Sequence, residues 1–420
     1  MKIAVFLNEL SLGGTEKAAC RWALGFQQRG HTVTVVSMKD GPRRTELEQN
    51  GIPLRIVSAS ESAIATALRE FKPDLVHAHA PGYPHAGDIL GSALNRLQNR
   101  LPVVQTNVFG RLDNPAEDAW TCFRLFISWT SCVQAARRAF IPLGEDYFTR
   151  CSVAVYPLDP APEPDKSEVA RMRAELGIGE DEVVFGRFSR PEPNKWTGLA
   201  LDAFRLALPR NRRIKLLLRE PPSAVSEALR KGPDADRFII LPATADAAEL
   251  RRTMAAVDAV LHTSSIGESF GYGIAEPMAL GKPVITHSIP WGDQAQIELV
   301  RHGEGGWVAS TPRAVASCIL TLAADRPARE RMGAFGRKHI LELSDPDVSV
   351  RRMERIFKAV LEGRPNPFLA EDLERARRTA AYLDEHQFGH SLGEQIALRP
   401  RYCRVRFHQW WRSVMNLGRC

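Results

Sequence analysis

The chain has 420 residues, of which 44% are hydrophobic and 25% are charged. This mixture is typical of an ordinary globular protein, and the length exceeds the size at which one hydrophobic core usually stops growing, so two domains are expected. The net charge is +7, but six arginines and no acidic residue lie in residues 399–420. The rest of the chain is nearly balanced, and we expect no nucleic-acid-binding core.

The cysteines and the apolar segments exclude further classes of protein. Seven cysteines are scattered without a CxxC pair, so we expect no disulfide framework and a reducing, cytoplasmic location. No stretch approaches the roughly 18 apolar residues of a membrane span. The first residues, MKIAVFLNEL, have only a short apolar run that Asn8 and Glu9 interrupt. This start predicts a first strand and not a secretion signal.

Short apolar strands alternate with helical patterns along most of the chain. The expected strands form two sets, KIAVFLN, TVTVVS, PLRIVS, DLVHAHA and VVQTN, and then EVVFGRFS, IKLLLRE, FIILPA, AVLHTS and PVITHS. Such alternation predicts parallel sheets covered on both faces. Between the sets, VAVYPLDPAPEPDK is rich in proline and acid and predicts a boundary near Leu158. We expect two doubly wound α/β domains, residues 1–157 and 158–345.

The C-terminal part of the chain has a different pattern. Residues 346–363 are expected to form an amphipathic helix, because apolar residues recur there at helical spacing, at Met353, Ile356, Phe357, Val360 and Leu361. Residues 364–420 are expected to form a basic extension that begins with a charged helix.

The tail of that extension, residues 399–420, mixes arginine with tryptophan. Helical spacing relates Phe407 to Trp411, and also relates Trp410 to Val414 and Leu417. A cationic amphipathic helix of this kind suits an anionic membrane surface, which would place the protein on the inner face of the cytoplasmic membrane. A helix packed on the body of the protein, or a disordered end, stays open as the alternative.

The first strand is followed by a glycine turn and then by a helix. Gly13 and Gly14 stand at this turn, where exposed N–H groups and the positive end of a helix favour an anion. The dinucleotide fingerprint GxGxxG is absent. A phosphate-type site and a tight turn without a ligand are both compatible with this stretch.

Cations follow the first strand of the second domain. In FGRFSRPEPNKWTG, Arg187, Arg190 and Lys195 lie at or just after the carboxyl end of the strand, where open α/β sheets bind their ligands. Arginine offers a fork of donors to phosphate oxygens and lysine adds a point charge, so these side chains could neutralise a diphosphate. A solvated loop with ordinary surface cations is the alternative.

Two glutamates frame a glycine-rich bend in HTSSIGESFGYGIAEPMALGKPVI. Glu268 is expected in a loop after a strand and Glu276 about two turns into the next helix, whose first N–H groups belong to Phe270, Gly271 and Tyr272. The loop acid could take a hydroxyl, the helix end a phosphate and the helical acid a diol. A sugar nucleotide has its sugar, diphosphate and ribose in that order. The alternative is a helix with one ordinary surface glutamate, which is compatible with the same sequence.

Two histidines share a face at the end of the fourth expected strand. His77 and His79 lie two residues apart, so both side chains point to the same side. Metal binding is one interpretation, but polar residues lining a site at the strand end are the interpretation that we adopt, with His79 as the site residue. We expect no metal site in the protein.

These motifs occur in an order that resembles the retaining glycosyltransferases of the GT-B fold, in family 4 (group 1). The motifs are GGTE at 13–16, VHAH at 76–79, GR…R…K at 186–195 and E-x7-E at 268–276, within residues 1–362. The resemblance implies two Rossmann-like, doubly wound parallel-sheet domains facing a central cleft, with the helix at 346–363 crossing back to the first domain. It also implies a hexosyltransferase that uses a nucleoside diphosphate sugar as donor substrate, with no resident cofactor.

The resemblance also assigns roles to individual residues. Gly14 would face the donor diphosphate, and Arg190 and Lys195 would neutralise it, with Arg187 competing for the place of Arg190. Glu268 would contact the donor sugar, Glu276 would hold the ribose hydroxyls, and the amides from Phe270 to Tyr272 would meet the sugar and its phosphate. The family usually has a histidine where this chain has Asn107, which cannot carry a positive charge.

The implied reaction transfers a sugar with retention to a hydroxyl of a glycan or lipid-linked acceptor, in bacterial cell-surface polysaccharide or lipopolysaccharide synthesis. Two alternatives remain at the level of the sequence. One is a sugar-nucleotide epimerase of the same fold, and the other is a donor-binding partner subunit without turnover.

Overall fold

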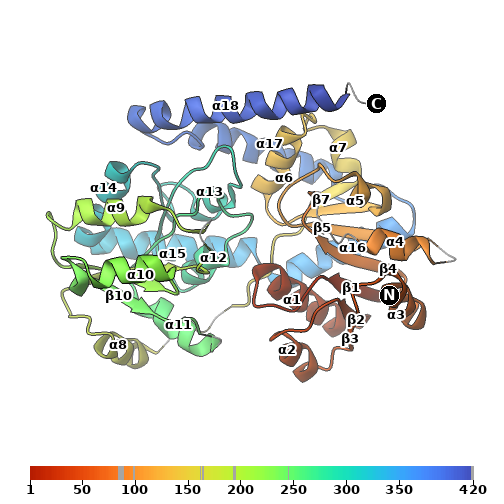
Figure 1. The fold of residues 1–420 in the computed structure, drawn as a ribbon, viewed down its shortest axis with the longest axis horizontal. Coiled ribbons are helices and arrows are strands. Elements are labelled where there is room, and N and C mark those ends of the chain that lie inside the picture. Colours follow the sequence, from red (N-terminus) through yellow and green to blue (C-terminus); the bar gives the residue numbers. More distant parts are fainter. Residues whose placement is uncertain are drawn as a thin grey trace. The chain divides into compact units, whose positions relative to one another are not determined.

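The computed structural model describes residues 1–83, 89–97, 100–160, 162, 165–192, 195–244 and 246–417, without the side chains of Trp410 and residues 412–417 (Figure 1). The chain divides into two compact units. Unit 1 consists of Met1–Asp159 and Ser344–Ala381, and unit 2 of Pro160–Leu343 and the chain from Tyr382 onward. The change at Asp159 and Pro160 falls within the proline-rich segment. The extension that begins at residue 364 is shared between the units.

Unit 1 is built on a parallel sheet, which has seven strands in the described part of the chain, in the order β3-β2-β1-β4-β5-β6-β7. The strands are β1 (Lys2–Leu7), β2 (Thr32–Ser37), β3 (Leu54–Ile56), β4 (Leu75–Ala80), β5 (Val103–Asn107), β6 (Phe123–Phe126) and β7 (Cys151–Val153). The helices are α1 (Gly14–Gln28), α2 (Arg44–Gln49), α3 (Glu61–Phe71), α4 (Leu90–Asn95), α5 (Pro115–Trp120), α6 (Trp129–Arg138), α7 (Glu145–Thr149), α16 (Pro346–Leu361) and most of α17 (Leu369–His386). All six residues of β4 are buried, which is the pattern of a sheet covered on both faces.

Unit 2 repeats this plan with a parallel sheet in the order β10-β9-β8-β11-β12-β13, six strands among the residues described. The strands are β8 (Val183–Phe188), β9 (Ile214–Arg219), β10 (Phe238–Leu241), β11 (Ala259–Leu261), β12 (Val284–Thr286) and β13 (Gly306–Val308). The helices are α8 (Lys166–Glu175), α9 (Gly198–Ala207), α10 (Ser223–Arg230), α11 (Ala247–Ala256), α12 (Tyr272–Ala279), α13 (Ala295–Val300), α14 (Pro312–Ala324), α15 (Arg326–Leu343) and α18 (Leu392–Leu417), with a short 3₁₀ turn at Ala235–Arg237. The expected pair of parallel α/β domains is confirmed, while β6, β7 and β13 escaped the sequence analysis.

The strand orders fix where each unit can hold a ligand. In each sheet the winding direction reverses at one strand pair, β1 and β4 in unit 1 and β8 and β11 in unit 2. Ligands of open α/β sheets bind at the carboxyl ends of the strands at such a switch point. In unit 1, the glycine turn follows β1 and His79 lies at the end of β4. In unit 2, the cationic loop follows β8 and the paired glutamates follow β11.

Helix α16 packs on helix α1 within unit 1. The indole Nε1 of Trp22 donates to Ser349 Oγ at 2.8 Å, and the rings of Phe26 and Phe357 lie 5.3 Å apart. Gly25 provides the room, because a Cβ there would come within 2.6 Å of Val350 Cγ2. Helix α16 is therefore a component of the core of unit 1.

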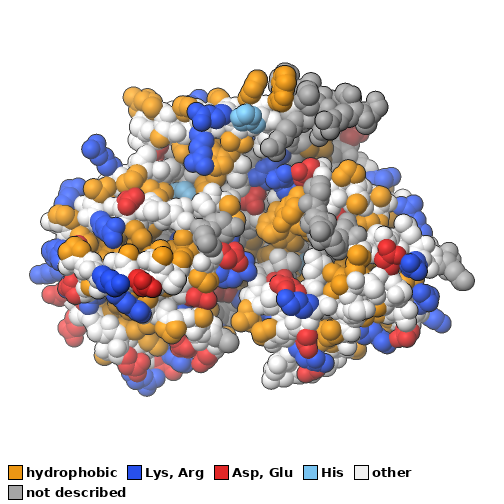
Figure 2. Space-filling model, in the orientation of Figure 1, with side chains coloured by type: hydrophobic (Ala, Val, Ile, Leu, Met, Phe, Trp, Pro, Cys, Tyr) orange, Lys and Arg blue, Asp and Glu red, His pale blue; other side chains and the backbone are white. Residues whose placement is uncertain are grey.

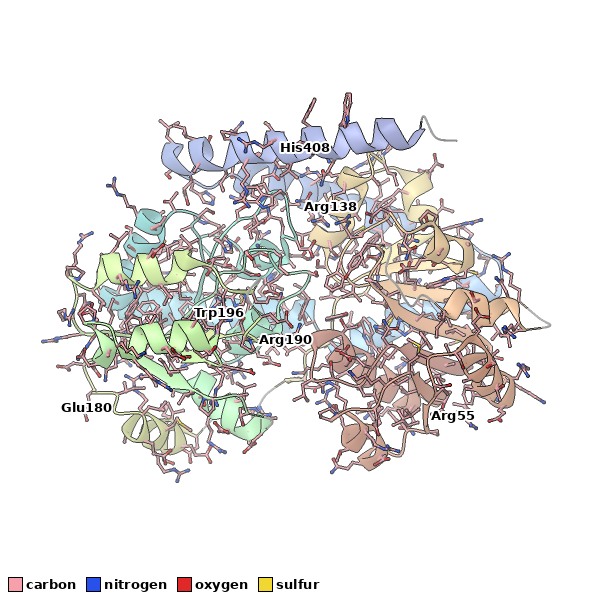
Figure 3. All side chains as sticks on the ribbon, in the orientation of Figure 1. Arg55, Arg138, Glu180, Arg190, Trp196 and His408 are labelled. Atoms are coloured by element: carbon pink, nitrogen blue, oxygen red, sulfur yellow. The ribbon has the colours of Figure 1, made fainter. Side chains whose placement is uncertain are left out.

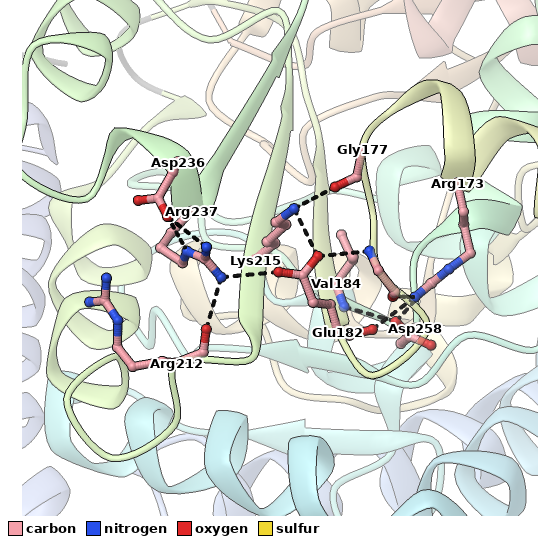
Figure 4. Close-up of polar contacts among 10 residues, drawn as sticks. Arg173, Gly177, Glu182, Val184, Arg212, Lys215, Asp236, Arg237 and Asp258 are labelled. Atoms are coloured by element: carbon pink, nitrogen blue, oxygen red, sulfur yellow. Dashed lines mark hydrogen bonds and ion pairs between the residues drawn. The ribbon is translucent and has the colours of Figure 1, made fainter.

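Unit 2 has a network of charged side chains at the amino ends of its strands, away from the carboxyl ends where a ligand would bind (Figure 4). The carboxylate of Glu182, just before β8, accepts from Lys215 Nζ at 2.8 Å and from Arg237 Nη1 at 3.0 Å. Asp258, just before β11, accepts from Val184 N at 2.8 Å and from Arg173 Nη1 at 3.0 Å. These contacts join the beginnings of the central strands, so we assign the network to the stability of unit 2.

Among the described helices, none is long and apolar enough to cross a membrane.

A buried histidine makes the stability of unit 1 depend on pH. His77 lies among the rings of Trp22, Phe26 and Phe357, and burial lowers the pKa of His77 from 6.5 to about 3. Between these values the unfolded chain binds the proton and the folded chain does not. We therefore expect the free energy of unfolding to fall as the pH is lowered from 7 towards 4, by about 2 kcal/mol at pH 5 from His77 alone.

Urea unfolding at pH 7.5 and pH 5 measures this effect. The variant His77→Phe, which keeps an aromatic ring in the cluster, should reduce the difference between the two pH values. The control His408→Gln, at an exposed position on α18, should leave it unchanged. An equal reduction in both variants would contradict the assignment to His77.

Candidate functional site

Glu268 is the centre of a buried charged cluster in unit 2. It lies in the loop between β11 and α12 and is 9% exposed. Its Oε2 accepts from Lys195 Nζ at 2.9 Å, and its Oε1 accepts from His262 Nε2 at 3.0 Å. Burial by itself would raise the pKa of Glu268, but the charge of Lys195 and the hydrogen bond with His262 lower it to about 2. The carboxylate is therefore ionised at any physiological pH.

His262 is a part of this cluster that the sequence analysis missed. It directly follows β11, and burial lowers its pKa although the neighbouring carboxylate opposes this. The imidazole is therefore neutral, and its Nε2–H group donates a hydrogen bond to Glu268 Oε1. A single histidine at a strand end has no spacing signature, so only the folded chain reveals its partner.

Glycine residues allow the loop of Glu268 to take its path. Gly267 has φ +76°, and a Cβ there would lie 1.8 Å from the carbonyl oxygen of Asp293. Gly273, in the first turn of α12, has no room for a side chain either, since a Cβ would lie 2.2 Å from the carbonyl oxygen of Phe188. The glycines bring α12 against the end of β8, and with it the loop that carries Glu268.

Arg187 is a buried cation with unused donors. It lies near the end of β8, is 1% exposed, donates Nη2 to the carbonyl oxygen of Lys195 and stacks on the ring of Trp196 at 4.1 Å. Burial lowers the pKa of Arg187 to about 10, with the charge of Glu268 acting in the opposite direction. Its Nε and Nη1 atoms have no hydrogen-bond partner among the described residues. Buried donors are rarely left without a partner, so this pattern suggests a site for an anion.

Arg190 has a different environment. Its side chain is exposed and pairs with Glu192 at 3.0 Å (Figure 3). Its carbonyl oxygen accepts from Trp196 Nε1 at 2.8 Å and from Ser189 Oγ at 3.2 Å. The structure thus brings Arg187, Lys195 and Glu268 together, while the Arg190 guanidinium lies at the surface of unit 2.

Helix α12 begins directly after the Glu268 loop. Gly271 is its N-terminal cap with φ +104° and supplies no side-chain hydrogen bond to the first turn. Phe270 is buried and meets Tyr272 edge to face at 5.0 Å. Tyr272 and the half-buried Glu276 are four residues apart and share a side of the helix. The prediction that Glu268 lies in a loop and Glu276 in the helix after it is confirmed, but α12 begins at Tyr272, so Glu276 lies about one turn into the helix and not two.

Unit 1 contains the remaining predicted site residues. Gly13 caps α1 and Gly14 is its first residue, and a Cβ on Gly13 would lie 2.2 Å from Glu16 Oε2. His79 at the end of β4 is 5% exposed, and neither ring nitrogen has a hydrogen-bond partner in the described part of the chain. Burial and, secondly, the nearby His77 lower the pKa of His79 well below its usual value. His79 is therefore a neutral, unsatisfied imidazole at the switch point of its sheet.

Asn107 uses both ends of its side chain within unit 1. As the last residue of β5, it donates Nδ2 to the carbonyl oxygen of Arg111 at 2.6 Å and accepts from Arg111 N at 3.1 Å. Gly82, with φ +80°, packs so closely that a Cβ there would lie 2.3 Å from Asn107 Nδ2. The amide therefore closes the loop after β5.

The described residues contain no group of three or more His, Cys, Asp or Glu side chains that could hold a metal ion. Within each unit, the site residues gather at the carboxyl edge of the sheet. In unit 2 these residues provide cations, hydrogen-bond donors and the ionised carboxylate of Glu268.

Comparison with known proteins agrees with this arrangement. Residues 13–185 match the family model described as "Glycosyl transferase 4-like domain", and residues 181–325 match the model described as "Glycosyl transferases group 1". No curated protein sequence matches the chain significantly.

Solved structures with the same fold include two that are named as glycosyltransferases. HepE from Anabaena, in complex with UDP-glucose, is 20% identical with a TM-score of 0.69 over 86% of this chain and 100% of that chain. A glycosyltransferase from Rickettsia africae ESF-5 is 16% identical with a TM-score of 0.70 over 86% and 98% of the two chains. WaaG, a glycosyltransferase involved in lipopolysaccharide biosynthesis, is 14% identical with a TM-score of 0.62 over 84% and 99%.

The fold is thus GT-B, two parallel-sheet α/β domains in one chain. The two family models and the fold together support a glycosyltransferase of the GT-B type.

The position of Gly267 yields a test of the loop geometry. Gly267→Ala should lower the free energy of unfolding by at least about 3 kcal/mol, because the new Cβ meets the Asp293 carbonyl and the backbone has a positive φ. Gly303→Ala is the matched control, since Gly303 has φ +82° and open space around its Cβ position. It should cost about 1 kcal/mol. Urea denaturation measures both, and equal losses would show that the contact with Asp293 does not constrain the loop.

Proposed function

We propose that this protein is a retaining glycosyltransferase, which moves a hexose from a nucleoside diphosphate sugar to a hydroxyl of a glycan or lipid-linked acceptor. The proposed setting is cell-surface polysaccharide or lipopolysaccharide synthesis on the cytoplasmic side of a bacterial membrane. The observation that carries the proposal is the buried cluster of Arg187, Lys195 and Glu268. It offers unused cationic donors for a diphosphate beside an ionised carboxylate.

The cations would stabilise the leaving group. Breaking the bond between the anomeric carbon and the diphosphate oxygen leaves the electron pair, and hence negative charge, on the diphosphate. The unused donors of Arg187, the ammonium of Lys195 and the first N–H groups of α12 can each meet that charge. We assign the diphosphate to Arg187 in preference to Arg190, because the Arg190 side chain already pairs with Glu192 at the surface.

Glu268 would act as an anion throughout the reaction. With a pKa of about 2 it holds no proton to donate at neutral pH. Its charge instead suits a hydrogen bond from a sugar hydroxyl and stabilises positive charge on the ring as the anomeric bond breaks. In the proposed step, the acceptor oxygen attacks the anomeric carbon from the face that the diphosphate leaves, and the acceptor proton passes to a diphosphate oxygen.

The remaining residues receive supporting roles. Glu276 would hold the ribose hydroxyls, and the amides from Phe270 to Tyr272 the sugar and its phosphate. In unit 1, Gly13 and Gly14 are assigned to the diphosphate and the unsatisfied His79 to the reacting groups. Asn107 acts by fixing the loop that ends at Arg111, since both ends of its amide are already bonded there.

Substitution of Arg187 and of Arg190 tests whether the buried or the exposed arginine stabilises the leaving diphosphate. Arg187→Gln should lower kcat on the order of a hundredfold, because a preorganised donor to the leaving group is lost. Arg190→Gln should change kcat less than about threefold, as expected for an exposed, screened charge. The measurement is release of nucleoside diphosphate, with UDP-glucose as the first donor because HepE was solved with it. A larger loss in Arg190→Gln would reverse the assignment.

Glu268→Gln tests the reaction class. The variant should bind UDP with nearly unchanged affinity but turn over donor on the order of a hundredfold more slowly, because the charge that supports the transition state is gone. Sugar nucleotides are offered in parallel and the products are identified by mass and by NMR. Wild-type protein that isomerises the donor sugar without releasing UDP would be an epimerase, and tight binding without any turnover would define a partner subunit.

A further inference from the structure

Helix α18 is held firmly on unit 2 by one of its faces. Glu394 is buried there and accepts from the backbone of His390 at 3.0 Å and of Ser391 at 3.1 Å, and its other oxygen accepts from Ser310 N. Arg401 lies over the ring of Trp291 at 4.1 Å. These contacts orient the helix about its axis, so its opposite face is defined.

The opposite face of α18 is apolar and exposed. Leu392 is 75% exposed, Ile396 64%, Phe407 59% and Trp411 51%, and Cys403 between them is also exposed. Intervals of four, seven, four and four residues place these side chains in one line along the helix. We call these five residues the apolar stripe; from first to last it is about 28 Å long at 1.5 Å per residue. An exposed apolar surface of this kind usually marks a contact with another partner.

The structure describes one of the two groups of apolar residues that the sequence places at helical spacing in residues 399–420. Phe407 and Trp411 point outward and continue a stripe that starts at Leu392. The second expected group, the side chains of Trp410, Val414 and Leu417, lies outside the described residues, as do residues 418–420.

Positive charge borders the apolar stripe. Arg399 and Arg404 are exposed near it, and no ion pair holds either of them within the described residues. His408 is exposed on the same helix (Figure 3), and Figure 2 shows hydrophobic, basic and histidine side chains next to one another along α18. The one acidic residue in the sequence of α18 is Glu394, which is buried on the other face. The outward surface of the helix is therefore apolar with cationic edges.

We propose that the apolar stripe docks unit 2 on the surface of an anionic lipid bilayer, with α18 lying in the plane of the headgroups. Phenylalanine, tryptophan and leucine side chains on one face with arginine beside them are the composition of helices that bind in this way. The arginines would meet lipid phosphates while the stripe enters the acyl boundary. A second copy of the chain fits less well, because pairing two stripes about a two-fold axis would bring arginines of like charge together. This inference does not depend on the proposed reaction.

Co-sedimentation of the full-length protein with vesicles tests the proposal. Vesicles of 70% phosphatidylcholine and 30% phosphatidylglycerol should retain the protein, and pure phosphatidylcholine vesicles should bind it at least tenfold more weakly. Raising NaCl from 0.05 M to 0.5 M should weaken binding to the anionic vesicles to a similar extent, because the arginine contribution is screened. Failure of the wild-type protein to bind the anionic vesicles would overturn the proposal without any variant.

Two variants locate the contact. The double substitution Ile396→Asp with Phe407→Asp should reduce binding at least tenfold, and both positions are exposed, so folding should be preserved. Leu206→Asp is the matched control, since Leu206 is 49% exposed on α9 of unit 2, and it should bind as the wild type does. Circular dichroism and Tm verify the fold of each. If the double variant binds vesicles unchanged, or if wild type forms a dimer that the double variant abolishes while neither binds vesicles, the stripe is not a lipid-docking surface.

Discussion

The ion pair between Lys195 and Glu268 is the contact around which unit 2 arranges its candidate site. Two residues that are 73 positions apart are joined at 2.9 Å, and their side chains are 19% and 12% exposed. The pair keeps Glu268 ionised against the effect of burial, and the neutral His262 holds the second oxygen of the same carboxylate. An isolated carboxylate at this depth would favour its neutral form, so the charge at the site depends on these two partners.

The glycines of the site allow its charged groups to lie close together. Gly267 lets the Glu268 loop approach Asp293, and Gly273 lets α12 approach the end of β8. The start of a helix, a carboxylate and two cations therefore meet at the carboxyl edge of one sheet, while the network around Glu182 secures the other edge. A site whose charges are fixed in advance loses little free energy by reorganisation when a charged group binds, which is the condition under which electrostatic stabilisation is strong.

The sequence predicted the parts of the site that depend on local order along the chain. Strand ends, the glycine bend and the loop-and-helix placement of Glu268 and Glu276 follow from periodicity and turn residues. It could not choose between Arg187 and Arg190, because their difference is burial: one is enclosed beneath Trp196 and the other pairs with Glu192 in solvent. It also missed His262 and the short strands β6, β7 and β13, of which β7 ends at the start of the proline-rich segment that was interpreted as a domain boundary.

The packing of α16 on α1 has a consequence for how the protein is made. Trp22 finds its hydrogen-bond partner 327 residues further along the chain, and Phe26 packs against Phe357. A nascent chain that has emerged from the ribosome as far as Asp159 has every strand of the first sheet but lacks the helix that covers these aromatic side chains. Unit 1 therefore cannot complete its core until residues 160–343 of unit 2 have been translated. We expect apolar surface to stay uncovered during that interval, which is the condition under which incomplete chains aggregate or require chaperones.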